Sequence, residues 1–135
     1  MDLAHYRMVI PSDYESVQRA ESFLLNAIAE HDYSEVASFA VRLAVEEAIV
    51  NAIKHGNRLD PRKTVAIDMD VDASRVEIIV TDQGPGFDVA SVPDPTAQEN
   101  LEKPSGRGIM LMRFFMDEIR FNARGNQVTM VKRNA

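Results

Sequence analysis

The stretch VEEAIVNAIKHG, residues 45–56, sets two polar side chains within an otherwise apolar helical pattern. Glu47 and Asn51 stand four residues apart, so both project from one face of the helix that we expect over residues 34–55. Apolar residues follow two sides of this helix, which predicts that it is largely buried. A buried carboxylate needs a partner because its desolvation is costly. The amide of Asn51 suits Mg²⁺, and Glu47 is then a candidate base; the simpler alternative is a hydrogen-bonded pair on one helix.

A second motif, TDQGPGFD at residues 81–88, begins where a strand is expected to end. Gly84 and Gly86 allow the backbone to turn tightly and to approach a flat ring closely. Because a carboxylate only accepts hydrogen bonds, Asp82 would pair with the exocyclic amine of adenine and reject the carbonyl of guanine. This motif therefore predicts an adenine-binding turn, and the alternative is an ordinary tight turn capped by aspartate.

A third motif, GRGIM at residues 106–110, stands before a helix that we expect over residues 109–116. Backbone N–H groups at the start of a helix attract phosphate, and Gly106 and Gly108 permit a close approach. Arg107 would donate to a phosphate oxygen. The motif predicts a phosphate contact, and a flexible loop that ends at a helix is the simpler alternative.

The periodicity of apolar residues predicts the elements around these motifs. Ser12 and Glu15 have the spacing of a capping box, which predicts a helix from there to about residue 29. Alternation of apolar and polar residues predicts strands over residues 3–10, 64–71, 76–80, 119–123 and 128–132. Antiparallel hairpins with separate helices imply an α+β fold, a two-layer α/β sandwich with a mixed, mainly antiparallel sheet and helices on one face.

The size and charge of the chain limit its function. Its 135 residues are enough for one domain, residues 1–135, and too few for two comfortable cores. The formal net charge of −6 argues against broad nucleic-acid binding and against binding to an anionic membrane surface. The absence of cysteine excludes disulfides and thiolate chemistry. The N-terminal residues lack a long apolar run, so we expect a cytoplasmic protein without a signal peptide or membrane span.

The three motifs, in this order, resemble the N-box and the two glycine boxes of the Bergerat-fold ATPases, which include gyrase, heat-shock chaperones and histidine kinases. The shared patterns are ExxxNxxxH, DxGxGF and GxGxxxM. The stretches AVEEAIVNAIKHG, TDQGPGFD and GRGIMLMRFFMDEI are most similar to one branch, the small bacterial anti-sigma factors that are also serine-protein kinases. The resemblance runs from about residue 3 to residue 132 and implies the Bergerat ATP-binding fold, with an ATP lid over residues 88–105.

The resemblance also implies ATP and Mg²⁺ as cofactors and gives each motif a role. Asn51 would ligate Mg²⁺ at the phosphates, and Glu47 would be the general base on a serine or threonine hydroxyl. Asp82 would bind the adenine amine. Lys54 and His55, one turn past Asn51, are candidates for phosphate contact, although stabilising the helix dipole is the simpler role for both. The other implied nucleotide contacts are Gly84, Gly86, Phe87, Gly106, Arg107, Gly108 and Ile109.

In this branch the substrate is an anti-anti-sigma protein of the STAS type, and the same domain, usually a homodimer, binds and silences a sigma factor. We therefore expect an ATP-dependent anti-sigma regulatory factor that phosphorylates its antagonist. The alternative is a non-catalytic ATP-binding module that regulates a target other than a sigma factor, and Glu47 favours the kinase. One position departs from the family, because Gln127 stands where relatives often have a threonine near adenine.

Overall fold

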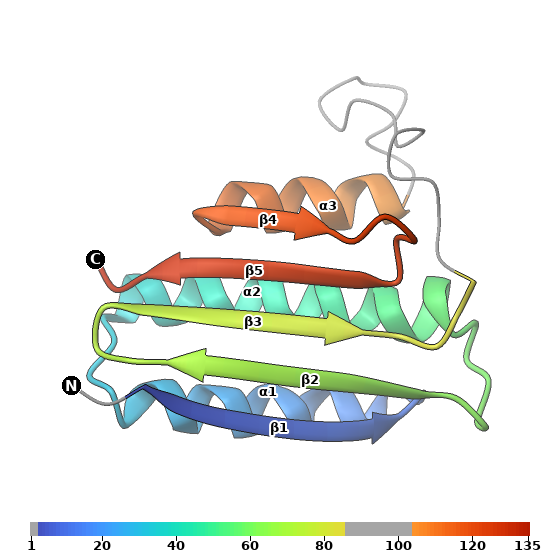
Figure 1. Cartoon of the computed structure of the whole chain (residues 1–135), viewed down its shortest axis with the longest axis horizontal. Helices are drawn as coiled ribbons and strands as arrows, with labels where there is room; N and C mark the ends of the chain where they lie inside the picture. Colours follow the sequence, from blue (N-terminus) through green and yellow to red (C-terminus); the bar gives the residue numbers. More distant parts are fainter. Residues whose placement is uncertain (1–2, 86–103) are drawn as a thin grey trace.

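Five strands form one open sheet (Figure 1). The computed structural model describes residues 3–85 and 104–135, except for the side chains of residues 104–107. The strand order is β1-β2-β3-β5-β4, and every neighbouring pair of described strands is antiparallel. The strands are β1 (Ala4–Pro11), β2 (Thr64–Val71), β3 (Arg75–Thr81), β4 (Glu118–Phe121) and β5 (Gln127–Arg133).

Helices cover one face of this sheet (Figure 1). They are α1 (Glu15–Ala29), α2 (Glu35–Asn51) and α3 (Pro104–Phe115), and α2 continues into a short π-helix, η1 (Ala52–Gly56). The predicted two-layer α+β sandwich with helices on one face is confirmed, but the sheet, expected to be mixed, is antiparallel throughout its described strands. None of the described helices has the length and apolarity that crossing a membrane requires.

The alternation within each strand separates an apolar face from a charged one. Outward side chains of β1 and β2 pair across the strands: Arg7 donates to both carboxylate oxygens of Asp68 at 2.8 Å, and His5 Nδ1 lies 2.6 Å from Asp70 Oδ1. Exposed pairs of this kind add little stability, so burial of the inward face holds the fold together. The inward residues of β2 and β3 are Val65, Ile67, Met69, Val71, Val76, Ile78 and Val80.

The expected capping box at Ser12 and Glu15 is wrong. The helix α1 begins at Glu15, and the N–H of Ser16 donates to Oδ1 of Asp13 at 2.9 Å. The hydroxyl of Ser12 donates instead to the carbonyl of Lys63 at 2.7 Å. Local spacing gave the wrong partner because the competing carbonyl lies 51 residues away in sequence.

The helix α2 starts where expected but is buried along one broad stripe rather than on two opposite sides. Ser34 caps it, because its hydroxyl accepts a hydrogen bond from the N–H of Ala37 at 3.0 Å. Val36 is 73% exposed, and Glu47 and Asn51 are half-buried. The stripe itself consists of Ala37, Ala40, Val41, Ala44, Val45, Ala48 and Ile49.

The helix α3 starts earlier than expected. It begins at Pro104, so Gly106, Arg107 and Gly108 lie in its first turns rather than before it. The predicted lid over residues 88–105 falls almost entirely outside the described residues.

Candidate functional site

The three motifs gather at one end of the sheet, where β3 and η1 end and where α3 and β5 begin (Figure 1). Two close backbone approaches join them. Gly56, at the end of η1, lies against Asp82, and Gly108 of α3 lies against Asn51. Segments far apart in sequence therefore form one site.

Asp82 follows β3 and is held over a glycine turn. Its Oδ1 accepts a hydrogen bond from the N–H of Gly84 at 2.8 Å. A Cβ placed on Gly56 would overlap the Asp82 carboxylate, and a Cβ placed on Gly84 would overlap the carbonyl oxygen of Gly56. Glycine is therefore required at position 84, where an added Cβ would meet backbone atoms, whereas a Cβ at position 56 would force the Asp82 carboxylate to move.

The carboxylate of Asp82 keeps capacity to accept further hydrogen bonds. A carboxylate offers about four acceptor positions, and the N–H of Gly84 uses one of them. Burial raises the pKa of Asp82, while the Gly84 hydrogen bond and the charges of Lys63 and Arg124 oppose that rise. The turn thus presents a half-buried acceptor that suits a ligand amine.

The backbone of Asp82 is held by the hairpin that joins β4 to β5. The N–H of Asp82 donates to the carbonyl of Asn126 at 2.9 Å, and Asn126 Nδ2 donates to the carbonyl of Asp82 at 3.3 Å. Gln127 is turned to another neighbour, because its Nε2 donates to the hydroxyl of Thr81 at 3.1 Å. The side-chain amide beside Asp82 is therefore that of Asn126, which the motifs did not indicate.

Asn51 and Glu47 share a face of α2, and the first turns of α3 approach the amide of Asn51. A Cβ placed on Gly108 would stand 2.5 Å from Asn51 Nδ2, so a larger residue there would displace this amide. The N–H groups in the first turn of a helix lack helical partners and favour phosphate. An amide, a carboxylate and a helix start fit a phosphate-bound Mg²⁺, which takes few protein ligands and keeps its waters.

The surroundings of Glu47 make its carboxylate a stronger base. Burial raises the pKa of Glu47, and the charge of Glu46 raises it further. A base is most effective when its pKa lies near the working pH, so an upward shift of a glutamate favours proton transfer.

Glu47→Gln should therefore stabilise the protein at neutral pH. The raised pKa means that the folded chain binds this proton more tightly than the unfolded chain, whose glutamate keeps a value near 4.5. The proton on Glu47 thus contributes fully to the stability of the wild type below that value. This contribution is lost as the pH rises through the pKa of Glu47 in the folded protein. The neutral variant avoids this loss, and its gain is on the order of 0.5 kcal/mol because water still reaches the side chain.

Urea unfolding at about pH 4 and about pH 7.5 checks this, with equal stabilities expected at the lower value and a more stable variant at the higher one. Glu15→Gln is the matched control, because Glu15 is exposed in the first turn of α1, where its charge favours the helix dipole. An equal gain in both variants would contradict the prediction for Glu47.

The π-helix η1 carries the two basic candidates. The N–H of Asn57 donates to the carbonyl of Ala52 at 2.8 Å, five residues back, which makes the last turn wider than an α-helical one. Lys54 and His55 are exposed on this turn. Burial lowers the pKa of His55, as does the charge of Lys54. Their contact with phosphate stays a prediction.

The remaining candidates separate into three groups. Gly106 lies in the first turn of α3 rather than before the helix as expected, and its contact with phosphate stays a prediction. Ile109 is 5% exposed and packs within the hydrophobic core. Gly86, Phe87 and the side chain of Arg107 lie outside the described residues.

Three residues that the motifs did not indicate belong to the site: Gly56, Asn57 and Asn126. A glycine at a helix end is a signal for Gly56, but it fits an ordinary C-cap equally well. The asparagines gave no signal, because their partners lie far away in sequence.

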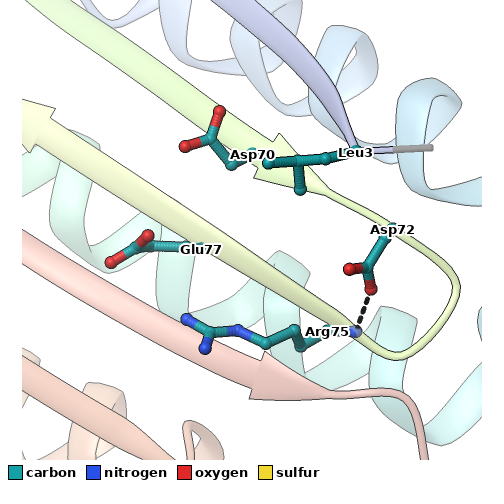
Figure 2. A pocket seen from close by; sticks show the side chains of 5 residues that line it. All are labelled: Leu3, Asp70, Asp72, Arg75 and Glu77. Carbon is teal, nitrogen blue, oxygen red and sulfur yellow. Dashed lines mark hydrogen bonds between the residues drawn. The ribbon is translucent and has the colours of Figure 1, made fainter. Parts of the chain in front are cut away.

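A hollow of about 290 Å³ lies elsewhere, on the outer face of the sheet (Figure 2). Its lining carboxylates already have partners in the chain. Asp72 accepts from the N–H of Arg75 at 3.0 Å, and Glu77 accepts from Arg120 at 3.2 Å. Asp70 is paired with His5. The carboxylates of this hollow are therefore engaged in hydrogen bonds and ion pairs within the chain, unlike the Asp82 carboxylate of the motif site, which keeps capacity to accept further hydrogen bonds.

Comparison with known proteins agrees with this arrangement. Residues 10–132 match the family described as the histidine kinase-like ATPase domain. The anti-sigma F factor of Geobacillus stearothermophilus is 31% identical over 130 residues, which cover 94% of this chain and 87% of that protein. The serine-protein kinase RsbW of Bacillus subtilis (strain 168) is 30% identical over a 137-residue alignment, with coverages of 95% and 84%.

A shorter match, to the anti-sigma F factor of Anoxybacillus flavithermus, is 34% identical over 95 residues. It covers 68% of this chain and 64% of that protein, which is less than two thirds of the relative. Family and relatives agree with the resemblance that the three motifs carry. The chain belongs to the histidine kinase-like ATPase domain family, in the branch of the anti-sigma factors and serine-protein kinases.

Proposed function

We propose that the protein is an ATP-dependent anti-sigma regulatory factor that phosphorylates an anti-anti-sigma protein of the STAS type on serine or threonine and sequesters a sigma factor. The names of its relatives support both activities. The observation that carries the kinase activity is the half-buried Glu47, one helical turn before the amide that Gly108 approaches. In this proposal residues 1–135 are one histidine-kinase-like ATPase domain, cytoplasmic and homodimeric.

ATP would lie across the end of the sheet that the three motifs share. The Asp82 carboxylate accepts from the adenine amine, and the N–H groups at the start of α3 receive the phosphates. Asn51 would hold Mg²⁺, which neutralises charge on the phosphates when bound. The other residues proposed to contact nucleotide are Lys54, His55, Gly84, Gly86, Phe87, Gly106, Arg107, Gly108 and Ile109.

Glu47 performs the proton transfer of the proposed reaction. Its carboxylate takes the proton of the substrate hydroxyl as the hydroxyl oxygen bonds to the γ-phosphorus of ATP. The bond between that phosphorus and the bridging oxygen breaks, so ADP leaves and the phosphoester forms. The raised pKa of Glu47 helps it to accept the proton, and its spacing of four residues within α2 places it on the same face as Asn51.

Phosphorylation of the antagonist explains the regulatory half of the proposal. A phosphate adds about −1.5 to −2 charges to the antagonist. At the surface through which the antagonist binds, this added charge would weaken the complex, and the net charge of −6 on this chain adds to the repulsion. The released protein is then free to hold the sigma factor.

Purification of the protein with its partners from its native cell, followed by incubation with ATP labelled at the γ-phosphate and Mg²⁺, tests the proposal. We expect label on a serine or threonine of a small partner. We also expect a sigma factor among the bound proteins that carry no label. Binding of both partners without any transfer of label would contradict the kinase and leave only the binding function.

A further inference from the structure

Asn57 joins the end of η1 to the turn that carries Asp82. Its side chain is buried, with 0% exposure. Asn57 Oδ1 accepts a hydrogen bond from the N–H of Gln83 at 2.8 Å. Nδ2 donates to the hydroxyl of Ser12 at 2.8 Å and to the carbonyl of Thr64 at 2.9 Å. Both amide protons and the amide oxygen have partners, so the side chain is fixed in one orientation.

The backbone of Asn57 is fixed as well. Its N–H closes the π turn on Ala52, and its carbonyl accepts from the N–H of Asp60 at 3.0 Å. The next two residues, Arg58 and Leu59, have φ of 53° and 59°. This left-handed region is unfavourable for residues with side chains and persists where the surroundings hold it. The strained loop therefore leaves from a firmly held residue.

Asn57, Thr64 and Gln83 form a closed ring of hydrogen bonds beside the turn that carries Asp82. Gln83, directly after Asp82, uses its own side chain to accept from the N–H of Thr64 at 2.7 Å. Asn57 and Gln83 therefore both pair with the first residue of β2 and with each other. On the other side, Asn126 holds the N–H of Asp82. Asp82 is thus held on both sides of its Cα: Asn126 accepts from the N–H of Asp82 itself, and Asn57 accepts from the N–H of the next residue, Gln83.

We infer that Asn57 is a positioning residue for base selection: its amide holds the turn so that the Asp82 carboxylate meets the amino group of adenine. The inference rests on the proposed function, because it takes Asp82 as the adenine acceptor. An acceptor selects for an amine only when it is held in place, since it must remain unpaired when a base without the amine binds. A carboxylate that can swing away to water loses that selectivity.

The test compares the Kd of ATP with the Kd of purine riboside 5′-triphosphate, which lacks the 6-amino group. We expect the wild type to prefer ATP by about 10- to 100-fold, as one hydrogen bond to a charged group provides. In Asn57→Ala we expect the remaining preference for ATP to be about threefold or less. The ratio is the readout, because a fold that is only less stable weakens both nucleotides equally.

Asn134→Ala is the matched control, because Asn134 follows the end of β5 and binds the turn between β2 and β3, away from the start of β5 where Asp82 is held. The amide of Asn134 also makes three hydrogen bonds: it accepts from the N–H of Ser34 at 3.0 Å and donates to the carbonyls of Asp32 at 3.2 Å and Ala73 at 3.0 Å. We expect this variant to lose stability and to keep the wild-type ratio. An equal collapse of the ratio in Asn134→Ala would show that any loss of packing has this effect and would overturn the inference.

Ser12→Ala keeps the test valid if Asn57→Ala fails to fold. It removes only one partner of the Asn57 amide, and we expect the ATP preference to fall by about threefold. If the folded variants keep the wild-type preference for ATP, the role of Asn57 is overturned and the proposed function still stands. A wild type without any preference overturns the assignment of Asp82 itself, and the inference with it.

A double-mutant cycle with Asp82→Ala separates positioning from other effects. If Asn57 acts through Asp82, the combined variant should have the same nucleotide ratio as Asp82→Ala alone. Independent, multiplicative losses in the ratio would contradict a role through Asp82.

Discussion

Replacing Glu47 by glutamine should lower the rate of phosphotransfer by about 10²- to 10⁴-fold, the usual contribution of a general base. Glutamine keeps the size of the side chain and cannot take the proton of the substrate hydroxyl. ATP affinity should stay within about threefold, because the proposed adenine and phosphate contacts come from other residues. Transfer of labelled phosphate to the purified antagonist, measured with a parallel titration of ATP, separates the two effects.

Glu46→Gln is the control for this experiment, because it makes the same chemical change one residue earlier. Glu46 raises the pKa of Glu47 less than burial does, so its removal should change the rate by no more than about threefold. Phosphotransfer at the wild-type rate in Glu47→Gln would remove Glu47 from the mechanism. A large loss in Glu46→Gln alone would instead place the base at that residue.

Replacing Gly84 by alanine should abolish the stabilisation of the protein by ATP. The added Cβ would overlap the carbonyl oxygen of Gly56, and a backbone atom cannot rotate away as a side chain can. The turn must therefore move relative to η1 and carry the Asp82 carboxylate with it. Loss of the hydrogen bond from the amine to this carboxylate costs about 10- to 100-fold in affinity. The shift of the melting temperature with ATP–Mg²⁺ measures this loss, because stabilisation follows RT ln(1 + [L]/Kd).

The wild type should melt higher with millimolar ATP–Mg²⁺ and show little change with GTP. Ala20→Gly controls for stability alone, because it places glycine inside α1 at a fully buried site away from the motifs. It should lower the melting temperature, as a loss of about 1 kcal/mol does, and keep the ATP response. A full ATP response in Gly84→Ala would show that the turn adapts, and no response in the wild type would count against Asp82 as the adenine acceptor.

The sequence predicted those parts of the fold that depend on neighbours in the chain. Apolar alternation in β2 and β3 located both strands and their antiparallel pairing, because period two follows directly from strand geometry. The i, i+4 spacing of Glu47 and Asn51 likewise placed both on one face of α2. Asp82 and Gly84 were found from a short turn motif. These features depend on contacts within a few residues.

The missed features depend on contacts between distant segments. Ser12 matched a local capping box, yet its hydroxyl binds Lys63, and Asn57 binds Ser12, 45 residues earlier. The apolar pattern predicted burial on two sides of α2, yet Val36, which belongs to that pattern, is exposed. Helical periodicity gives the spacing of side chains around an axis, and only the packed neighbours decide which of them meet water.

The position of β5 in the sheet also affects when a newly made copy gains its nucleotide site. The strand β5 pairs with the central strand β3, although it is the last of the five in sequence. Asn126, just before β5, holds both backbone groups of Asp82. During synthesis on the ribosome, the turn that carries Asp82 therefore lacks the support of Asn126 until the hairpin between β4 and β5 has emerged. Before that point the turn is held on one side only, through the hydrogen bond from the N–H of Gln83 to Asn57.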